Sequence, residues 1–117
     1  MLSRDQILGA DDLKTSEVSV PEWGGVVRVK MMTAGERDEW EALVYLDKKG
    51  GQEQSPKDIR AKLVVFTCVD EQGARLFTVD DIPALTKKSA VAMNRLWAAA
   101  SKMNRVMAAD VTDLEKN

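Results

Sequence analysis

Two runs of alternating apolar and polar residues, separated by a proline and two glycines, constrain the fold of this chain most strongly. The first run covers residues 17–20 and the second covers residues 26–31. A period of two is typical of strands that bury one face. Pro21 ends the first run because proline cannot donate a hydrogen bond to a neighbouring strand, and the glycines at 24–25 can adopt the positive backbone angles of a tight turn. The pattern therefore predicts a β-hairpin over residues 17–31, which must pack on other elements to be stable.

A helix signal follows the hairpin directly. Thr33 and Glu36 have the spacing of a capping box, in which each side chain bonds to the backbone N–H of the other residue. Apolar residues then recur at three- and four-residue intervals over 40–44, as on one face of a helix. The polar residues 47–54 include two glycines, so they predict a flexible loop after this helix.

A second helix start lies at Ser55 and Pro56, because serine caps helices and proline is tolerated in the first helical turn. The apolar run that follows, residues 63–69, is compatible with either a helix or a buried strand. The start signal and the length of the segment favour a helix over residues 59–69. A turn is predicted at residues 70–73.

Two further helices are predicted in the last third of the chain. Thr78 begins a short helix, because Pro83 blocks further extension unless it lies within the first turn. A long helix then extends from Thr86 or Lys88 to Met107. Its alanines favour a helix, and its apolar residues form one broad stripe.

Together these elements predict the α+β class: a mostly helical single domain with an N-terminal β-hairpin packed on three to four helices. A chain of 117 residues has the size of one domain. We expect this domain to cover residues 1–109. Residues 110–117 are polar and are expected to form a frayed tail.

The composition argues against most common catalytic and metal sites. The chain has no histidine and one cysteine, so it lacks the histidine pairs of hydrolases and the thiolate sets of structural zinc sites. Neither pair of adjacent glycines has the spacing of a phosphate-binding loop. Cys68 lies in an apolar run and is interpreted as a buried hydrophobic residue. We therefore expect no enzyme activity, no cofactor and no metal.

The charge pattern argues against nucleic-acid and membrane partners. Lys and Arg number 17, Asp and Glu number 19, and these charges are interleaved to give a net charge of −2. Nucleic-acid binders instead gain affinity from clustered lysines and arginines. No apolar run is long enough to span a membrane, and residues 1–12 lack the layout of a secretion signal. A single cysteine fits a reducing cytoplasm.

Partner binding is the function class that is left, and methionines and tryptophans are its candidate residues. Methionine adapts to irregular apolar partners, and tryptophan is enriched in binding hot spots. On the last predicted helix the candidates are Met93, Trp97, Met103 and Met107. Alternatively, the methionines fill gaps in the core. Trp97 lies on the border of the apolar stripe and can belong partly to the core and partly to a contact surface. Trp23, at the predicted hairpin tip, is either a lid on the core or an exposed anchor.

Two stretches of the sequence carry a family resemblance. They are ILGADDLKTSEVSVPEWGGVVRVKMMTAGERDEWEA at residues 7–42 and RAKLVVFTCVDEQGARLFTVDDIPALTKKSAVAMNRLWAAASKMN at residues 60–104. Their shared elements include ADDL, PEWGG, T-x-x-E-R, D-E-x-G-x-R-L-F and D-D-I-x-x-L. In this order they resemble the tail assembly chaperones of long, non-contractile-tailed bacteriophages, in the short form of those proteins. The matching residues are packing and turn residues and contain no active-site signature.

The resemblance implies a non-enzymatic chaperone that binds and solubilises the tape-measure protein and helps to recruit tail-tube subunits. It implies that the protein works in the host cytoplasm, self-associates along its extended partner and is absent from the finished virion. We expect a helical segment of that partner to lie in an apolar groove along the last helix. The alternative is a small helical DNA-binding or transcription-adaptor protein, against which the interleaved charge argues.

Overall fold

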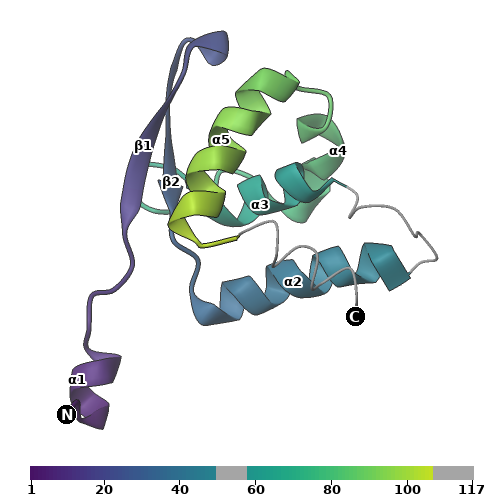
Figure 1. Ribbon diagram of the computed structural model, residues 1–117. Coiled ribbons are helices and arrows are strands. Elements are labelled where there is room, and N and C mark those ends of the chain that lie inside the picture. The colour runs from purple at the N-terminus through teal and green to yellow at the C-terminus, as the bar shows by residue number, and fades with distance from the viewer. Residues whose placement is uncertain (50–57, 107–117) are drawn as a thin grey trace.

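A small antiparallel sheet and a set of helices form the α+β fold of the computed structural model, which describes residues 1–49 and 58–106 (Figure 1). The predicted class, a mostly helical domain with an N-terminal β-hairpin, is confirmed. The helices are α1 (Arg4–Leu8), α2 (Ala34–Lys49), α3 (Ile59–Thr67), α4 (Ile82–Leu85) and α5 (Ala90–Met103). The strands are β1 (Thr15–Val20), β2 (Gly25–Lys30) and β3 (Cys68–Val69), and short 3-10 turns lie at Pro21–Trp23 and Val79–Asp81.

The sheet has the strand order β1-β2-β3, and both pairings are antiparallel. Val18 lies opposite Val27 in the hairpin, so the prediction of a hairpin is confirmed, with strands over 15–30 instead of 17–31. Gly24 has a φ of 72°, which places it in the left-handed region that glycine enters without steric cost. This single glycine therefore lets the chain reverse between the two strands.

The third strand lies at the end of the apolar run 63–69, for which the sequence left a buried strand open as the alternative to the favoured helix. Cys68 and Val69 leave α3 in an extended conformation and pair with the middle of β2. The helix predicted over 59–69 is therefore confirmed through Thr67 and wrong for the last two residues. Two residues are too few to show a strand period, and their pairing partner lies far away in the sequence.

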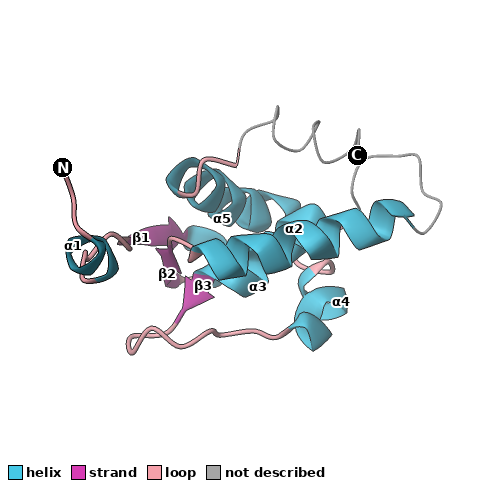
Figure 2. Cartoon of the chain, turned by 90° about the horizontal axis from the view of Figure 1, so that it is seen from below, coloured by secondary structure: helices cyan, strands magenta, loops and turns pink. Residues whose placement is uncertain are grey.

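Helix α3 is the centre of the core. Every residue from Ala61 to Thr67 is buried, and α3 packs against α5 and against α2 (Figure 2). The hairpin lies along α5 (Figure 1). The fully buried side chains include Val20, Val29, Trp40, Val44, Leu63, Val64, Val65 and Leu96. Burial on all sides explains why α3 shows a continuous apolar run instead of a stripe.

The start of α2 is set by the predicted capping box. The Glu36 N–H donates to Thr33 Oγ1 at 3.1 Å, and the Thr33 N–H donates to Glu36 Oε1 at 2.9 Å. These two bonds satisfy backbone donors that have no partner inside a helix. Local sequence therefore fixes the point where the chain leaves the hairpin and enters α2.

The end of α2 differs from the prediction. The helix continues to Lys49, so the loop predicted over 47–54 is wrong for its first residues, because lysine has a high intrinsic helix propensity. Residues 50–57, with the predicted helix start at Ser55, lie outside the described residues. Residues 107–117, with the predicted tail, lie outside them as well.

Helix α5 is shorter than predicted. The Ser89 hydroxyl caps it by accepting a hydrogen bond from a first-turn backbone N–H at 3.2 Å, so α5 begins after the start predicted at 86–88. It ends at Met103 and not at Met107, because Arg105 has a positive φ of 55°. A right-handed helix cannot continue through that conformation.

Candidate partner-binding surface

The residues that the sequence predicts as contacts on α5 lie in different environments in the structure. Met93 is only 4% exposed and belongs to the core, and Trp97 is half-buried against that core. The guanidinium of Arg60 lies over the Trp97 ring, 5.9 Å from its centroid. Met103 is half-buried at the end of the helix, roughly 15 Å along its axis from Met93. Met107 lies outside the described residues.

Trp23 lies at the hairpin tip, where it is 39% exposed. Its neighbour Glu22 holds the tip against α5, because Arg95 Nε and Nη2 donate to the two carboxylate oxygens at 2.8 and 2.9 Å. This hydrogen bonding lowers the pKa of Glu22 and raises the pKa of Arg95. Trp97 is two positions beyond Arg95 and therefore lies on a different face of α5. Trp23 and Trp97 are thus not brought together in one site.

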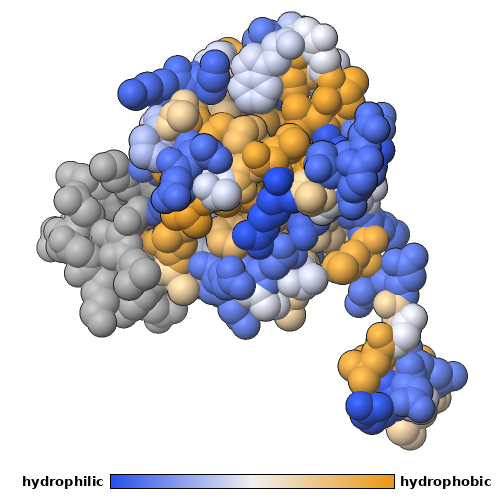
Figure 3. Space-filling view, turned by 180° about the vertical axis from the view of Figure 1, so that it is seen from behind, coloured by the Kyte–Doolittle hydropathy of each residue, from blue (hydrophilic) through white to orange (hydrophobic). Residues whose placement is uncertain are grey.

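Sequence reasoning missed several exposed large apolar side chains. They are Leu2, Ile7, Leu8 and Leu13 near the N-terminus, Val26 on β2, and Leu76, Val79 and Val91 after β3. Figure 3 shows apolar groups gathered on one face of the body and on the separate N-terminal segment. The sequence contained a signal that Val26 is exposed. Alternation along the strand places Val26 on the same face as Arg28 and Lys30, so it is an apolar residue on the polar face.

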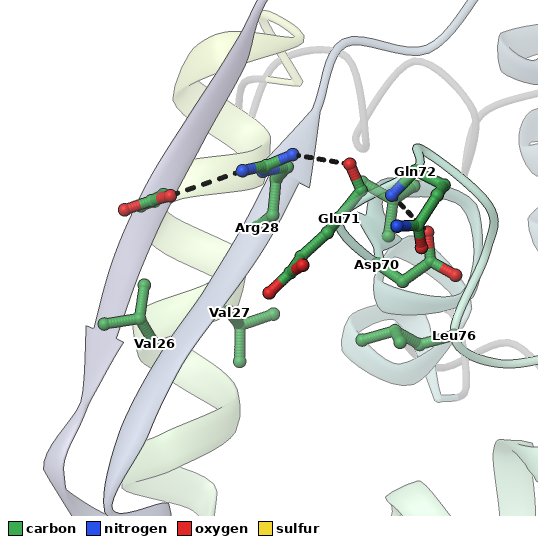
Figure 4. A pocket seen from close by; sticks show the side chains of 9 residues that line it. Val26, Val27, Arg28, Asp70, Glu71, Gln72 and Leu76 are labelled. Carbon is green, nitrogen blue, oxygen red and sulfur yellow. Dashed lines mark hydrogen bonds and ion pairs between the residues drawn. The ribbon is translucent and has the colours of Figure 1, made fainter.

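A groove of about 600 Å³ lies between β2 and the turn that follows β3 (Figure 4). We call it the hairpin groove. Its apolar lining is formed by Val26, Val27, Val69 and Leu76. The carboxylates of Glu17, Asp70 and Glu71 also line it, together with the single guanidinium of Arg28. The hairpin groove therefore combines an apolar wall with an acidic rim.

Hydrogen bonds hold the rim of the hairpin groove in place. Arg28 Nη1 donates to the backbone carbonyl of Glu71 at 3.0 Å, and Arg28 Nη2 lies 3.4 Å from Glu17 Oε1. Asp70 Oδ1 accepts hydrogen bonds from two backbone N–H groups of its own turn, at 2.8 and 3.0 Å. The rim is thus built before any partner arrives, which reduces the entropy lost on binding.

A second groove, of about 730 Å³, lies between the base of the N-terminal segment and the end of α5. We call it the arm-base groove. Its apolar lining includes Met31, Ala99 and Met103, and its cations are Lys14, Lys102 and Arg105. None of these three cations forms an ion pair with a residue of the described ranges. Met103 is therefore a predicted contact that does line a groove.

Within 1–49 and 58–106, no three side chains of the metal-ligating types gather into a cluster. Cys68 is buried, as predicted; burial raises the pKa of its thiol to about 12, against a smaller lowering by a hydrogen bond with Thr67. The thiol therefore stays protonated at neutral pH. No helix in these ranges is long and apolar enough to cross a bilayer.

Comparison with solved structures identifies the fold. The structure of the bacteriophage HK97 tail assembly chaperone matches with a TM-score of 0.59 at 19% sequence identity, over 85% of this chain and 90% of that chain. At this identity the likeness shows a shared fold, the fold of a tail assembly chaperone. The family described as phage tail assembly chaperone matches residues 7–117 of the sequence. The chain belongs to this family, and the predicted resemblance is confirmed. No curated protein matches the sequence.

Proposed function

We propose that this tail assembly chaperone binds and solubilises the tape-measure protein, its client, and helps to recruit tail-tube subunits without catalysing a reaction. Membership of the family supports the chaperone role and favours it over the DNA-binding or transcription-adaptor alternative. We further propose that the protein acts in the host cytoplasm, associates in several copies along one client chain, and leaves before the virion is complete.

The observation that supports client binding best is the hairpin groove. Val26 is 61% exposed and Leu76 is 47% exposed, and both side chains line the groove, from its two sides (Figure 4). Exposed apolar side chains that line a pre-formed groove are typical of a binding surface. A helical client segment presents apolar side chains at three- and four-residue intervals and can place them there. The acidic rim suits a segment that also carries lysine or arginine.

Two tryptophans extend this proposal beyond the groove itself. Trp23 lies at the tip of the hairpin whose second strand lines the groove, so it can add an aromatic contact at one end of a bound segment. Trp97 offers a second contact. It lies on a different face of α5 from Arg95, which holds the hairpin tip, and its half-buried ring lies beside Arg60. Several separate contacts suit a chaperone that must accept many different segments of one long chain.

Co-expression with the tape-measure protein of the same phage tests the proposal. We expect the double variant Val26→Asp, Leu76→Asp to bind the client at least about tenfold more weakly, and to leave more of it insoluble. Val91→Asp is the matched control, because Val91 is 57% exposed and lies outside the hairpin groove. Circular dichroism and thermal unfolding establish that each variant is folded. A folded double variant that still solubilises the client normally would exclude the hairpin groove as the client site.

A further inference from the structure

The N-terminal arm, residues 1–13, carries apolar side chains that lie apart from the body of the protein. None of these residues is buried. Helix α1 is five residues long and stands away from the other elements (Figure 1, Figure 3). Ile7 is 56% exposed and Leu8 is 68% exposed, and Leu2 and Leu13 are exposed as well. The arm thus presents an apolar surface that residues 14–49 and 58–106 of the same chain do not cover.

The arm is nevertheless a formed structural element. The Ser3 N–H donates to Gln6 Oε1 at 2.9 Å, and the Gln6 N–H donates to Ser3 Oγ at 3.2 Å. At the other end, the Gly9 N–H donates to the carbonyl of Asp5 at 3.0 Å. Isolated helices shorter than about 12 residues are marginal in water, so capping alone cannot stabilise α1. A capped helix with exposed apolar side chains needs a surface to pack on.

The arm-base groove complements the arm in polarity and in charge. Its lining combines apolar side chains with Lys14, Lys102 and Arg105, which have no ion-pair partner among the described residues. The arm combines its leucines and isoleucine with three aspartates and one arginine. Asp12 of the same chain also lines the groove, so the lining holds one carboxylate and three cations. Room is left for further acidic groups, which the arm of another copy can supply.

We propose that the N-terminal arm of one copy docks into the arm-base groove of a second copy, which makes the self-association part of the proposed function specific. A chain's own arm leaves its groove at Asp12 and then leads away from the body, so α1 does not fill the groove beside it (Figure 1). The arm up to Asp11 and the groove are different surfaces, so each copy can donate an arm and accept one. Ile7 and Leu8 of the donor lie on Met31 and Met103 of the acceptor.

Disulfide formation between differently sized chains tests this contact directly. One chain carries Ile7→Cys, and a second chain, extended by a tag, carries Met103→Cys. Cys68 does not interfere, because it is buried and its thiol stays protonated. We expect a crosslinked heterodimer under mild oxidation, and much less of it when Val91→Cys replaces Met103→Cys. Equal yields from the two pairs would overturn the proposal. A single chain that carries both Ile7→Cys and Met103→Cys and forms only an intramolecular disulfide would overturn it as well, because the arm would then occupy its own groove.

Sedimentation measures the contribution of the contact to association. The arm variant Ile7→Ser, Leu8→Ser removes the apolar contact without adding charge; it should weaken self-association by about tenfold or more and leave the unfolding temperature unchanged, since residues 1–13 are exposed in a single copy. Lys102→Glu should weaken it too, and Asp11→Lys in the partner should restore part of the loss. Undiminished association of the arm variant would overturn the arm contact and leave association through another surface intact. If the cysteine pair crosslinks as expected but the unaltered chain does not bind the client, the proposed function is refuted and the arm contact stands.

Discussion

The side-chain oxygen of Asn104 accepts a hydrogen bond from the backbone N–H of Met32 at 2.7 Å, across 72 residues of sequence. The Nδ2 group of the same side chain donates to the carbonyls of Lys30 at 3.3 Å and Ala100 at 3.0 Å. The backbone carbonyl of Asn104 accepts a hydrogen bond from Arg37 at 2.8 Å. One residue thus joins the end of α5 to the connection between β2 and α2.

We expect Asn104→Ala to lower the free energy of unfolding by about 1–3 kcal/mol, because it leaves the partly buried Met32 N–H without its acceptor. Asn94→Ala is the matched control on the same helix. It removes an exposed hydrogen bond with Arg60 and should cost no more than about 0.5 kcal/mol. Urea denaturation measures both variants, and equal costs would refute a structural role for the Asn104 amide.

Glu36 should make the stability of the protein sensitive to acid. Burial raises the pKa of its carboxyl, but hydrogen bonds from Lys30, the Thr33 backbone and Arg75 outweigh burial and lower the pKa from 4.5 to about 2. The folded protein therefore keeps this carboxylate charged at pH values where the unfolded chain binds a proton. The stabilisation is complete above pH 4.5 and is lost as the pH falls to about 2, on the order of 3 kcal/mol in all.

The measurement is the free energy of unfolding of Glu36→Gln and of the unaltered chain, from neutral pH down to about pH 2. The variant should be less stable at neutral pH, and the difference should shrink as the pH falls. Glu39→Gln, at an exposed position of the same helix, serves as the control. A difference that stays constant over the whole range would contradict the assignment to Glu36.

Trp40 and Trp97 should respond differently to truncation. Trp40 is fully buried, so Trp40→Ala should cost about 3–5 kcal/mol of folding stability, and Trp97→Ala, at a half-buried site, roughly half as much. If Trp97 also contacts the client, Trp97→Ala weakens binding by about 2 kcal/mol or more. Thermal unfolding and co-purification on the same samples separate the two effects. Normal binding by a folded Trp97→Ala variant would remove Trp97 from the client surface.

Cys68 should resist thiol reagents while the protein is folded. Burial raises its pKa to about 12, and the thiolate is the reactive form. Labelling of the native chain should therefore be slow and should accelerate on addition of denaturant, as the thiol becomes accessible. Val91→Cys supplies the comparison, because that position is 57% exposed and lies outside both grooves. Labelling of Cys68 at the rate of the exposed thiol would show that the sheet opens at β3.

Interactions between near neighbours explain which parts of the fold could be predicted from the sequence. The capping pair of Thr33 and Glu36, and the turn at Gly24, depend on residues within a few positions of one another. The bond between Asn104 and Met32 and the pairing of β3 with β2 depend on distant residues and leave no periodic signal. Periodicity predicts the face of an element and not the element that covers it.

The candidate surface shows the same division between local and distant information. The stripe on α5 predicts an apolar face, but it cannot tell Met93, which enters the core, from Met103, which lines a groove. The two grooves form where separate elements meet, so their lining residues share no spacing in the sequence. Ile7 and Leu8 were missed because a five-residue helix is too short to display a stripe.

The chain's three tryptophans occupy three different environments, and this has a spectroscopic consequence. Trp40 is enclosed by the core, Trp97 is half-enclosed beside a guanidinium, and Trp23 is 39% open to water at the hairpin tip. Dissolved collisional quenchers therefore reach the emission of Trp23 first and that of Trp40 last. Intrinsic fluorescence can consequently distinguish occupancy of the hairpin tip from loss of the core, without an added dye that would itself cover the surface under study.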